Sequence, residues 1–196
     1  MRIERNAPAK INLTLEVLGR RADGYHEVAS VMHTLSLHDT LALELPNAPL
    51  IDASQGEIVV VGEETPSSSF PRAQGEPEGG GIDSIPTDTR NLIWKAVEAF
   101  VKSSAHCHPV REWGADSVLW ERGQEGAGRG WRAQLIKRIP AQAGLGGGSS
   151  DAAAALAILA DWARRWKTAQ PNLYSIASKL GADVAFFVGK GAGGAS

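Results

Sequence analysis

A cluster of glycines runs directly into a strong helix-forming segment at residues 140–156, PAQAGLGGGSSDAAAAL. Glycine has no Cβ, so such a backbone can adopt positive φ values and bring several N–H groups close to one anion. The glycines of this cluster are Gly144, Gly146, Gly147 and Gly148. The alanines at 152–155 predict a helix, with residues 149–151 as its cap and first turn. Because the positive end of the helix dipole faces the loop, the stretch predicts a phosphate-binding loop, with a flexible Gly–Ser linker as the simpler alternative.

Two common phosphate-binding motifs do not fit this stretch. A P-loop closes its glycine run with Gly-Lys-Ser/Thr, and a dinucleotide-binding fingerprint needs a third glycine at the position of Ser149. The run here ends in Ser149, Ser150 and Asp151 instead. The loop is therefore expected to belong to another class of phosphate-binding site.

Residues 9–18 alternate between apolar and polar side chains, which predicts a half-buried strand. The apolar face is expected to consist of Ile11, Leu13, Leu15 and Val17. Lys10 and Asn12 share the other face, about 7 Å apart along the strand, and they either reach one ligand or form a solvated surface.

Two further stretches carry candidate functional side chains. Tyr25 and His26 follow a tight turn, and an aromatic ring beside an imidazole suits recognition of a nucleobase, with packing as the alternative. Asp183 is expected just past a helix end, ahead of the apolar run at 184–188, where an unpartnered buried carboxylate would cost several kcal/mol. On the pattern alone, Asp183 is either a functional carboxylate or a turn residue.

The remaining periodicities predict an α+β domain with a mostly antiparallel sheet and helices packed on one side. Further strands are expected at 40–45, 57–62 and 131–139, the first of them pairing with residues 9–18. Helices are expected at 91–105, 151–166 and 172–180, with Asn91 as an N-cap and Gly181 after the last helix. Residues 63–90 lack apolar periodicity and are expected to form a long, mobile loop.

Composition limits the partners of the chain. A net charge of −2 over 196 residues gives no electrostatic reason to bind nucleic acid or an anionic membrane. The single cysteine, Cys107, excludes an internal disulfide, and no apolar run approaches the about 18 residues of a membrane span. The first ten residues lack the apolar core of a signal peptide. These features predict a cytoplasmic protein without membrane or nucleic-acid partners. A monomer or weak homodimer is expected, although no sequence feature specifies the oligomeric state.

Three separate stretches resemble the GHMP kinases, a family that includes galactokinase, homoserine kinase and mevalonate kinase. The glycine loop matches the family's second motif, Pro-x-x-x-Gly-Leu-Gly-x-Ser-Ser, from Pro140 to Ser150. APAKINLTLEVLGRRADGYHEVASVM, residues 7–32, resembles the N-terminus of the branch that phosphorylates 4-diphosphocytidyl-2-C-methyl-D-erythritol. GADVAFFVGKG, residues 181–191, resembles Gly-(Ala/Ser)-Asp-Val-Pro-Phe-Phe of the same branch, with Ala185 in place of the usual proline.

The resemblance implies a ribosomal protein S5 domain 2-like fold and ATP-dependent phosphorylation of a hydroxyl group in non-mevalonate isoprenoid (terpenoid) synthesis. Lys10 matches the lysine at the transferring phosphoryl group, and Asp183 matches the catalytic base. Asn12, Tyr25 and His26 match residues that bind the cytidyl substrate, and ATP is used with Mg²⁺. The expected ATP-binding residues are Pro140, Ala143, Gly144, Leu145, Gly146, Gly147, Gly148, Ser149, Ser150, Asn91 and Lys137. Ser150 is the candidate contact for Mg²⁺, and no other protein ligand for a metal is expected.

The resemblance also implies a domain organisation. Residues 1–190 are expected to form an N-terminal ATP-binding domain with a mobile insertion at 63–90, and residues 191–196 the truncated start of a C-terminal domain. Two alternatives remain open. In the first alternative, the chain is another GHMP kinase that acts on mevalonate or homoserine. In the second, it is a non-catalytic nucleotide-binding remnant. Tyr25 and His26 argue against the first, because those acceptors carry no base to stack.

Overall fold

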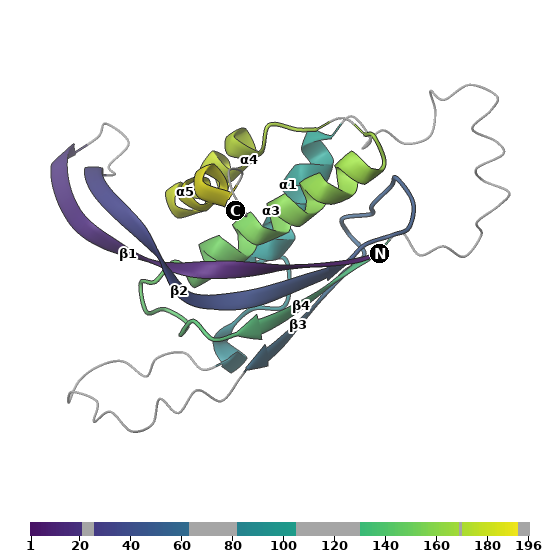
Figure 1. The fold of residues 1–196 in the computed structure, drawn as a ribbon, viewed down its shortest axis with the longest axis horizontal. Helices are drawn as coiled ribbons and strands as arrows, with labels where there is room; N and C mark the ends of the chain where they lie inside the picture. Colours follow the sequence, from purple (N-terminus) through teal and green to yellow (C-terminus); the bar gives the residue numbers. More distant parts are fainter. Residues whose placement is uncertain (21–25, 63–81, 105–129, 169, 192–196) are drawn as a thin grey trace, which may run out of the picture.

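Four strands form one mixed sheet in the order β1-β2-β4-β3 (Figure 1). The computed structural model describes residues 1–20, 26–62, 82–104, 130–168 and 170–191. The strands are β1 (Arg2–Arg20), β2 (His26–Glu44), β3 (Gly56–Gly62) and β4 (Trp131–Lys137). Within the described chain, β1 and β3 are therefore the edge strands.

The pairing of the strands is mostly antiparallel. β1 and β2 run antiparallel along their whole length, from the pair Arg2 and Glu44 to the pair Arg20 and His26. β2 and β4 are also antiparallel, whereas β3 and β4 are parallel and are connected through a helix. Residues 40–44 pair with β1 as predicted, but with residues 2–6 and not with residues 9–18, which pair with the earlier part of β2. Both strands are longer than predicted, and this extension sets the register.

The helices of the described chain cover one face of this sheet (Figure 1). They are α1 (Leu92–Ser103), α3 (Gly147–Arg165), α4 (Leu173–Leu180) and α5 (Ala182–Gly191), with a short 3-10 helix, η2 (Ile82–Ser84). The predicted fold class, an α+β domain with a mostly antiparallel sheet and helices on one side, is confirmed.

The core lies between α3 and the sheet. Leu41 and Leu43 point into it from β2, two residues apart because successive strand side chains face opposite sides. The facing stripe of α3 is rich in alanine, and Ala152, Ala155 and Leu156 are fully buried. Small side chains let the helix pack close to the strands. The loop that leads into α3 therefore ends at a helix that is packed against the sheet.

Two helix boundaries differ from the prediction. α3 begins at Gly147 and not near residue 151, because Gly146 caps it in a left-handed conformation with φ 72° and no side-chain cap is used. Residues 182–191 form α5, so Asp183 lies in the first turn of a helix and not in a connecting turn. The apolar run that follows is helical, with Val184, Phe187 and Val188 buried.

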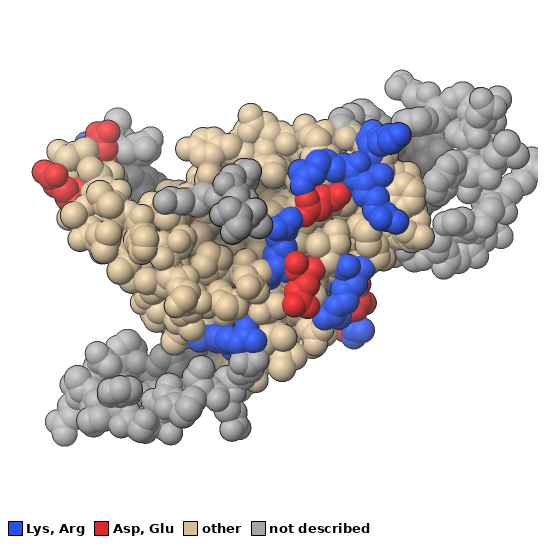
Figure 2. Space-filling model, in the orientation of Figure 1, with Lys and Arg blue, Asp and Glu red and all other residues tan. Residues whose placement is uncertain are grey.

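The expected burial of the apolar face of residues 9–18 is wrong for the described chain. Leu13, Leu15 and Val17 are 59%, 62% and 60% exposed. The hairpin of β1 and β2 extends past the layer of helices (Figure 1), so no described helix covers its far end. On the face shown in Figure 2, the surface of this hairpin is largely free of charge up to the tip.

Some predictions lie outside the described residues. These are Tyr25, Cys107, most of the expected insertion (63–81), and residues 192–196. Among the described helices, none combines the length and the apolar character needed to span a membrane.

Candidate active site

The glycine loop leaves β4 after Lys137 and winds through Pro140 to Gly146 before α3 begins. Its backbone takes positive φ values at Gln142 (63°), Gly144 (73°) and Gly146 (72°). Glycine adopts this left-handed conformation without a steric penalty. The winding therefore presents the first amides of α3, which have no intrahelical acceptor, toward the open side of the loop.

One backbone hydrogen bond joins the loop to β1. The N–H of Lys10 donates to the carbonyl of Leu145 at 2.9 Å. β1 is an edge strand, so outward-facing N–H groups are available, and its register with β2 shifts between Pro8 and Lys10. Such irregularities redirect side chains at functional sites. The hydrogen bond places Lys10 beside the last residues of the loop.

Lys10 and Asp183 come together next to this loop. The Lys10 Nζ atom lies 3.3 Å from Asp183 Oδ2, although the two residues come from opposite ends of the described chain. The Lys10 side chain is only 6% exposed and that of Asp183 is 38% exposed. A nearly buried ammonium needs a polar partner, and the carboxylate keeps one side open to solvent. The pair is thus placed to act on a molecule bound in front of it.

Asn12 completes the local cluster on the same strand. Its Oδ1 atom accepts a hydrogen bond from Lys10 Nζ at 3.3 Å. Lys10 and Asn12 share one face of β1, as the alternation predicts. Asp183 is held in the first turn of α5, where the helix dipole favours a negative charge.

Polar atoms without a partner mark the start of α3. Ser150 is 1% exposed, and its Oγ atom has no hydrogen-bond partner among the described residues. Asp151 Oδ1 is also buried and has no hydrogen-bond partner among the described residues. Buried polar atoms are normally paired, so these oxygens are available to a water molecule or a bound cation. A hydroxyl and a carboxylate oxygen are the donor types that Mg²⁺ prefers, and the residues fit that ion.

A groove of about 1050 Å³ opens beside the loop. It lies between the first half of β1, the middle of β2 and one face of α3, and it reaches Ser150 and Phe187. Lys10 and Asp183 are not among the residues that line it. The concave surface therefore adjoins the Lys10–Asp183 pair without enclosing it.

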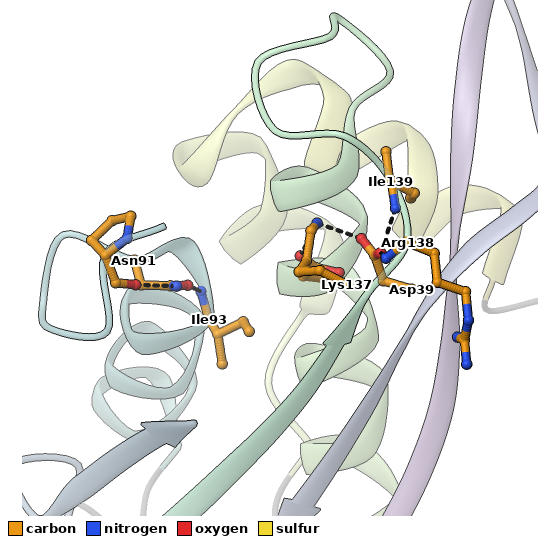
Figure 3. Close-up of polar contacts among 8 residues, drawn as sticks. Asp39, Asn91, Ile93, Lys137, Arg138 and Ile139 are labelled. Carbon is orange, nitrogen blue, oxygen red and sulfur yellow. Dashed lines mark hydrogen bonds and ion pairs between the residues drawn. The ribbon is translucent and has the colours of Figure 1, made fainter. Parts of the chain in front are cut away.

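Lys137 is buried beneath the loop and does not project from it (Figure 3). Its ammonium forms ion pairs with Asp39 and with Asp151, the latter at 3.1 Å. Burial raises the pKa of Asp151 to about 7, although Lys137 opposes the shift. Burial works against the charge on Lys137, but the two carboxylates outweigh it and raise the pKa of this lysine. Neither Asp39 nor this arrangement is predicted by the sequence patterns.

Asn91 caps α1 and directly precedes Leu92, which lies near the start of α3. Its side-chain oxygen accepts the N–H of Ile93 at 2.8 Å (Figure 3), and its side-chain nitrogen donates to the carbonyl of Pro86 at 2.6 Å. The predicted N-cap is confirmed. The neighbouring Leu92 approaches the loop, since a Cβ at Gly148 would lie 3.9 Å from its Cδ1 atom. The start of α1 therefore borders the expected ATP site.

The structure thus brings together Lys10, Asn12, Asp183, the glycine loop and the start of α1. Tyr25 lies outside the described residues, and of His26 only the backbone is described, as the first residue of β2. Within the described ranges, no group of three His, Cys, Asp or Glu side chains is arranged to hold a metal ion.

Comparison with known proteins gives a consistent set of similarities. A family described as "GHMP kinases N terminal domain" matches residues 91–191. A 4-diphosphocytidyl-2-C-methyl-D-erythritol kinase of Geotalea daltonii is 34% identical over 188 residues, covering 96% of this chain and 50% of the relative. The protein of that name from Corynebacterium diphtheriae is 35% identical over 180 residues, covering 92% of this chain and 48% of the relative. The chloroplastic one from Arabidopsis thaliana is 31% identical over 195 residues, covering 97% of this chain and 38% of the relative.

A solved structure agrees with these relatives. The crystal structure of a 4-(cytidine 5'-diphospho)-2C-methyl-D-erythritol kinase superposes with a TM-score of 0.55 at 32% identity. It is covered to 49%, whereas 96% of this chain is covered. The chain spans about half the length of the first two of these curated relatives.

Proposed function

The chain belongs to the GHMP kinases, and from this premise we propose that it takes part in ATP-dependent phosphorylation of a hydroxyl of 4-diphosphocytidyl-2-C-methyl-D-erythritol. The observation that carries the proposal is the 3.3 Å approach of Lys10 Nζ to Asp183 Oδ2 beside the glycine loop. The names of the matched relatives support the choice of acceptor. Use of ATP and Mg²⁺ and a cytoplasmic setting are parts of the same proposal.

Asp183 is proposed as the general base. Its open carboxylate accepts the proton of the acceptor hydroxyl as the oxygen attacks the γ-phosphorus of ATP, and ADP departs when the terminal P–O bond breaks. Lys10 stabilises the negative charge that develops on the phosphoryl oxygens. These two roles require both side chains to face the same small volume, which their contact allows.

The loop and its neighbours are proposed to hold the two substrates. The amides at the start of α3 bind the ATP phosphates, and Ser150 is the candidate ligand of Mg²⁺. When bound, Mg²⁺ would neutralise part of the phosphate charge. Asn12, Tyr25 and His26 are proposed to orient the acceptor, with Asn12 directly beside Lys10.

Ligand-dependent melting of the chain tests this assignment. A ligand at 100 times its Kd stabilises the folded state by about 2.7 kcal/mol, which raises the melting temperature of a domain of this size by several degrees. We expect ATP with Mg²⁺ and CDP each to raise the melting temperature, and mevalonate to leave it unchanged.

Each other outcome selects a different function. A shift with ATP and Mg²⁺ but none with CDP or mevalonate would favour a nucleotide-binding remnant, because the chain would then bind the nucleotide but not the cytidyl group. A shift with mevalonate and none with CDP would favour another small-alcohol kinase. No shift with any of the three would reject the proposal for this chain.

A further inference from the structure

Three buried ionisable side chains lie directly beneath the glycine loop. Lys137 ends β4, Asp39 lies on β2 and Asp151 lies in the second turn of α3, so one ammonium joins three elements. Their residues are 8%, 0% and 3% exposed. Charged groups are rarely buried to this extent unless they are paired, so this cluster is a built feature of the domain.

Asp39 fixes the chain at the entry to the loop (Figure 3). One of its carboxylate oxygens pairs with Lys137, and the other accepts the N–H of Arg138 at 2.6 Å and of Ile139 at 2.8 Å. These are the first two residues after β4. The path of the chain into the loop is thereby set by one side chain.

Asp151 fixes the exit from the loop. It lies in the second turn of α3 and reaches Lys137 Nζ at 3.1 Å. The ammonium is also close beneath the helix start, since a Cβ at Gly147 would lie 3.0 Å from it. Entry and exit are therefore tied to the same nitrogen, on either side of residues 140–146.

The directions of the hydrogen bonds in this cluster explain its presence better than a contribution to the stability of the folded domain does. Apolar side chains of similar volume often stabilise a core as well as a buried ion network does, whereas charged hydrogen bonds have defined directions. The directions here are toward the two ends of the loop. Two of the three donors of the Lys137 ammonium are used on the carboxylates.

We propose that Asp39, Lys137 and Asp151 form a buried clamp that holds both ends of the glycine loop in its phosphate-binding shape. Lys137 is then a positioning residue. The sequence had instead predicted that it contacts ATP. This inference rests on the proposed function, because the shape of the loop matters only if the loop binds phosphate.

Amide hydrogen exchange of the chain without nucleotide tests the clamp independently of ATP. In Lys137→Met we expect exchange at residues 138–150 to accelerate at least about tenfold, while α1 and α4 exchange as in the unchanged protein. Val97→Ala is the matched control, because it removes buried atoms of α1 that take no part in the clamp and should accelerate exchange throughout the core. Unchanged exchange at residues 138–150 in folded Lys137→Met would overturn the proposal.

Variants of the two carboxylates test the entry and the exit of the loop separately. They also replace Lys137→Met if that variant fails to fold. Asp39→Asn should accelerate exchange chiefly at residues 138 and 139, and Asp151→Asn chiefly at residues 147–150. Equal acceleration at both ends in both variants, or none, would contradict separate control of entry and exit.

Calorimetric titration with ATP and Mg²⁺ separates the clamp from a direct contact. We expect Lys137→Met to weaken ATP binding about tenfold together with faster loop exchange, and Lys137→Arg to recover part of the affinity. Weaker binding with unchanged exchange would make Lys137 a nucleotide contact and overturn the clamp. If the unchanged chain fails to bind ATP, the proposed function fails, and the exchange data still decide whether the clamp exists.

Discussion

Asp183→Asn is expected to lower the rate of phosphoryl transfer about 100- to 10,000-fold, the usual contribution of a positioned general base. The amide keeps the size of the carboxylate and its place in the first turn of α5, but it cannot accept the hydroxyl proton. Binding of ATP should change little, because the proposed phosphate contacts come from the loop. The rate is measured as transfer of labelled phosphate from ATP to the cytidyl acceptor.

Lys10→Met should cause a loss of similar size, because it removes the charge that faces Asp183 and the developing phosphoryl oxygens. An exposed pair on α1 supplies matched controls. Lys102 and Glu98 are joined at 2.5 Å, and Lys102→Met and Glu98→Gln make the same chemical changes away from the site. Exposed pairs contribute little, so both controls should keep full activity. A Lys10 or Asp183 variant with more than about a tenth of the activity would contradict the assigned roles.

Gly146→Ala is the second change with a large expected effect. Gly146 has φ 72°, and a Cβ there would lie 2.9 Å from Lys10 Cγ, 3.1 Å from Lys10 Cε and 3.3 Å from Phe187 Cε2. The left-handed backbone costs about 1–2 kcal/mol for a residue with a Cβ, and the close contacts push the Lys10 side chain away from Asp183. We expect both stability and phosphoryl transfer to fall.

Gly144→Ala separates these two effects. Gly144 has nearly the same φ, 73°, but a Cβ there meets nothing within 4 Å. It should lose only the stability due to the left-handed backbone, no more than Gly146→Ala loses in urea unfolding, whereas its rate of transfer should fall at least about tenfold less. Gly189→Ala, with open space around it on α5, is the neutral reference. Equal loss of activity in Gly144→Ala and Gly146→Ala would show that backbone strain alone, and not displacement of Lys10, limits the reaction.

The sequence predicts those features of the fold that depend on local patterns. The alternation in β1 identifies which side chains share a face, and Asn91 marks the start of α1 through its capping oxygen. It does not reveal whether a face is covered, and Leu13 and Leu15 remain exposed because the hairpin extends past the helices. The sequence predicts the start of α3 near residue 151, whereas the helix begins at Gly147. The N-cap Gly146 has no side chain that would mark this boundary in the sequence.

The candidate site depends on contacts between distant segments, and these are less visible in a sequence. The approach of Lys10 to Asp183 was expected from the family resemblance of both stretches, since no local periodicity links them. Lys137 was expected at the nucleotide, whereas its ammonium is occupied by Asp39 and Asp151. Asp39 could not be assigned from its neighbours, because its partners are Lys137 at the end of β4 and the two residues that follow it, about 100 residues along the chain.

The most direct test of the account is a crystal structure of the chain with Mg²⁺ and a non-hydrolysable ATP analogue. The account predicts that the phosphates lie against the backbone amides at the start of α3, with the terminal phosphate facing Lys10 and Asp183. A nucleotide bound elsewhere, with the glycine loop empty and the Lys10–Asp183 pair facing no phosphate, would contradict it.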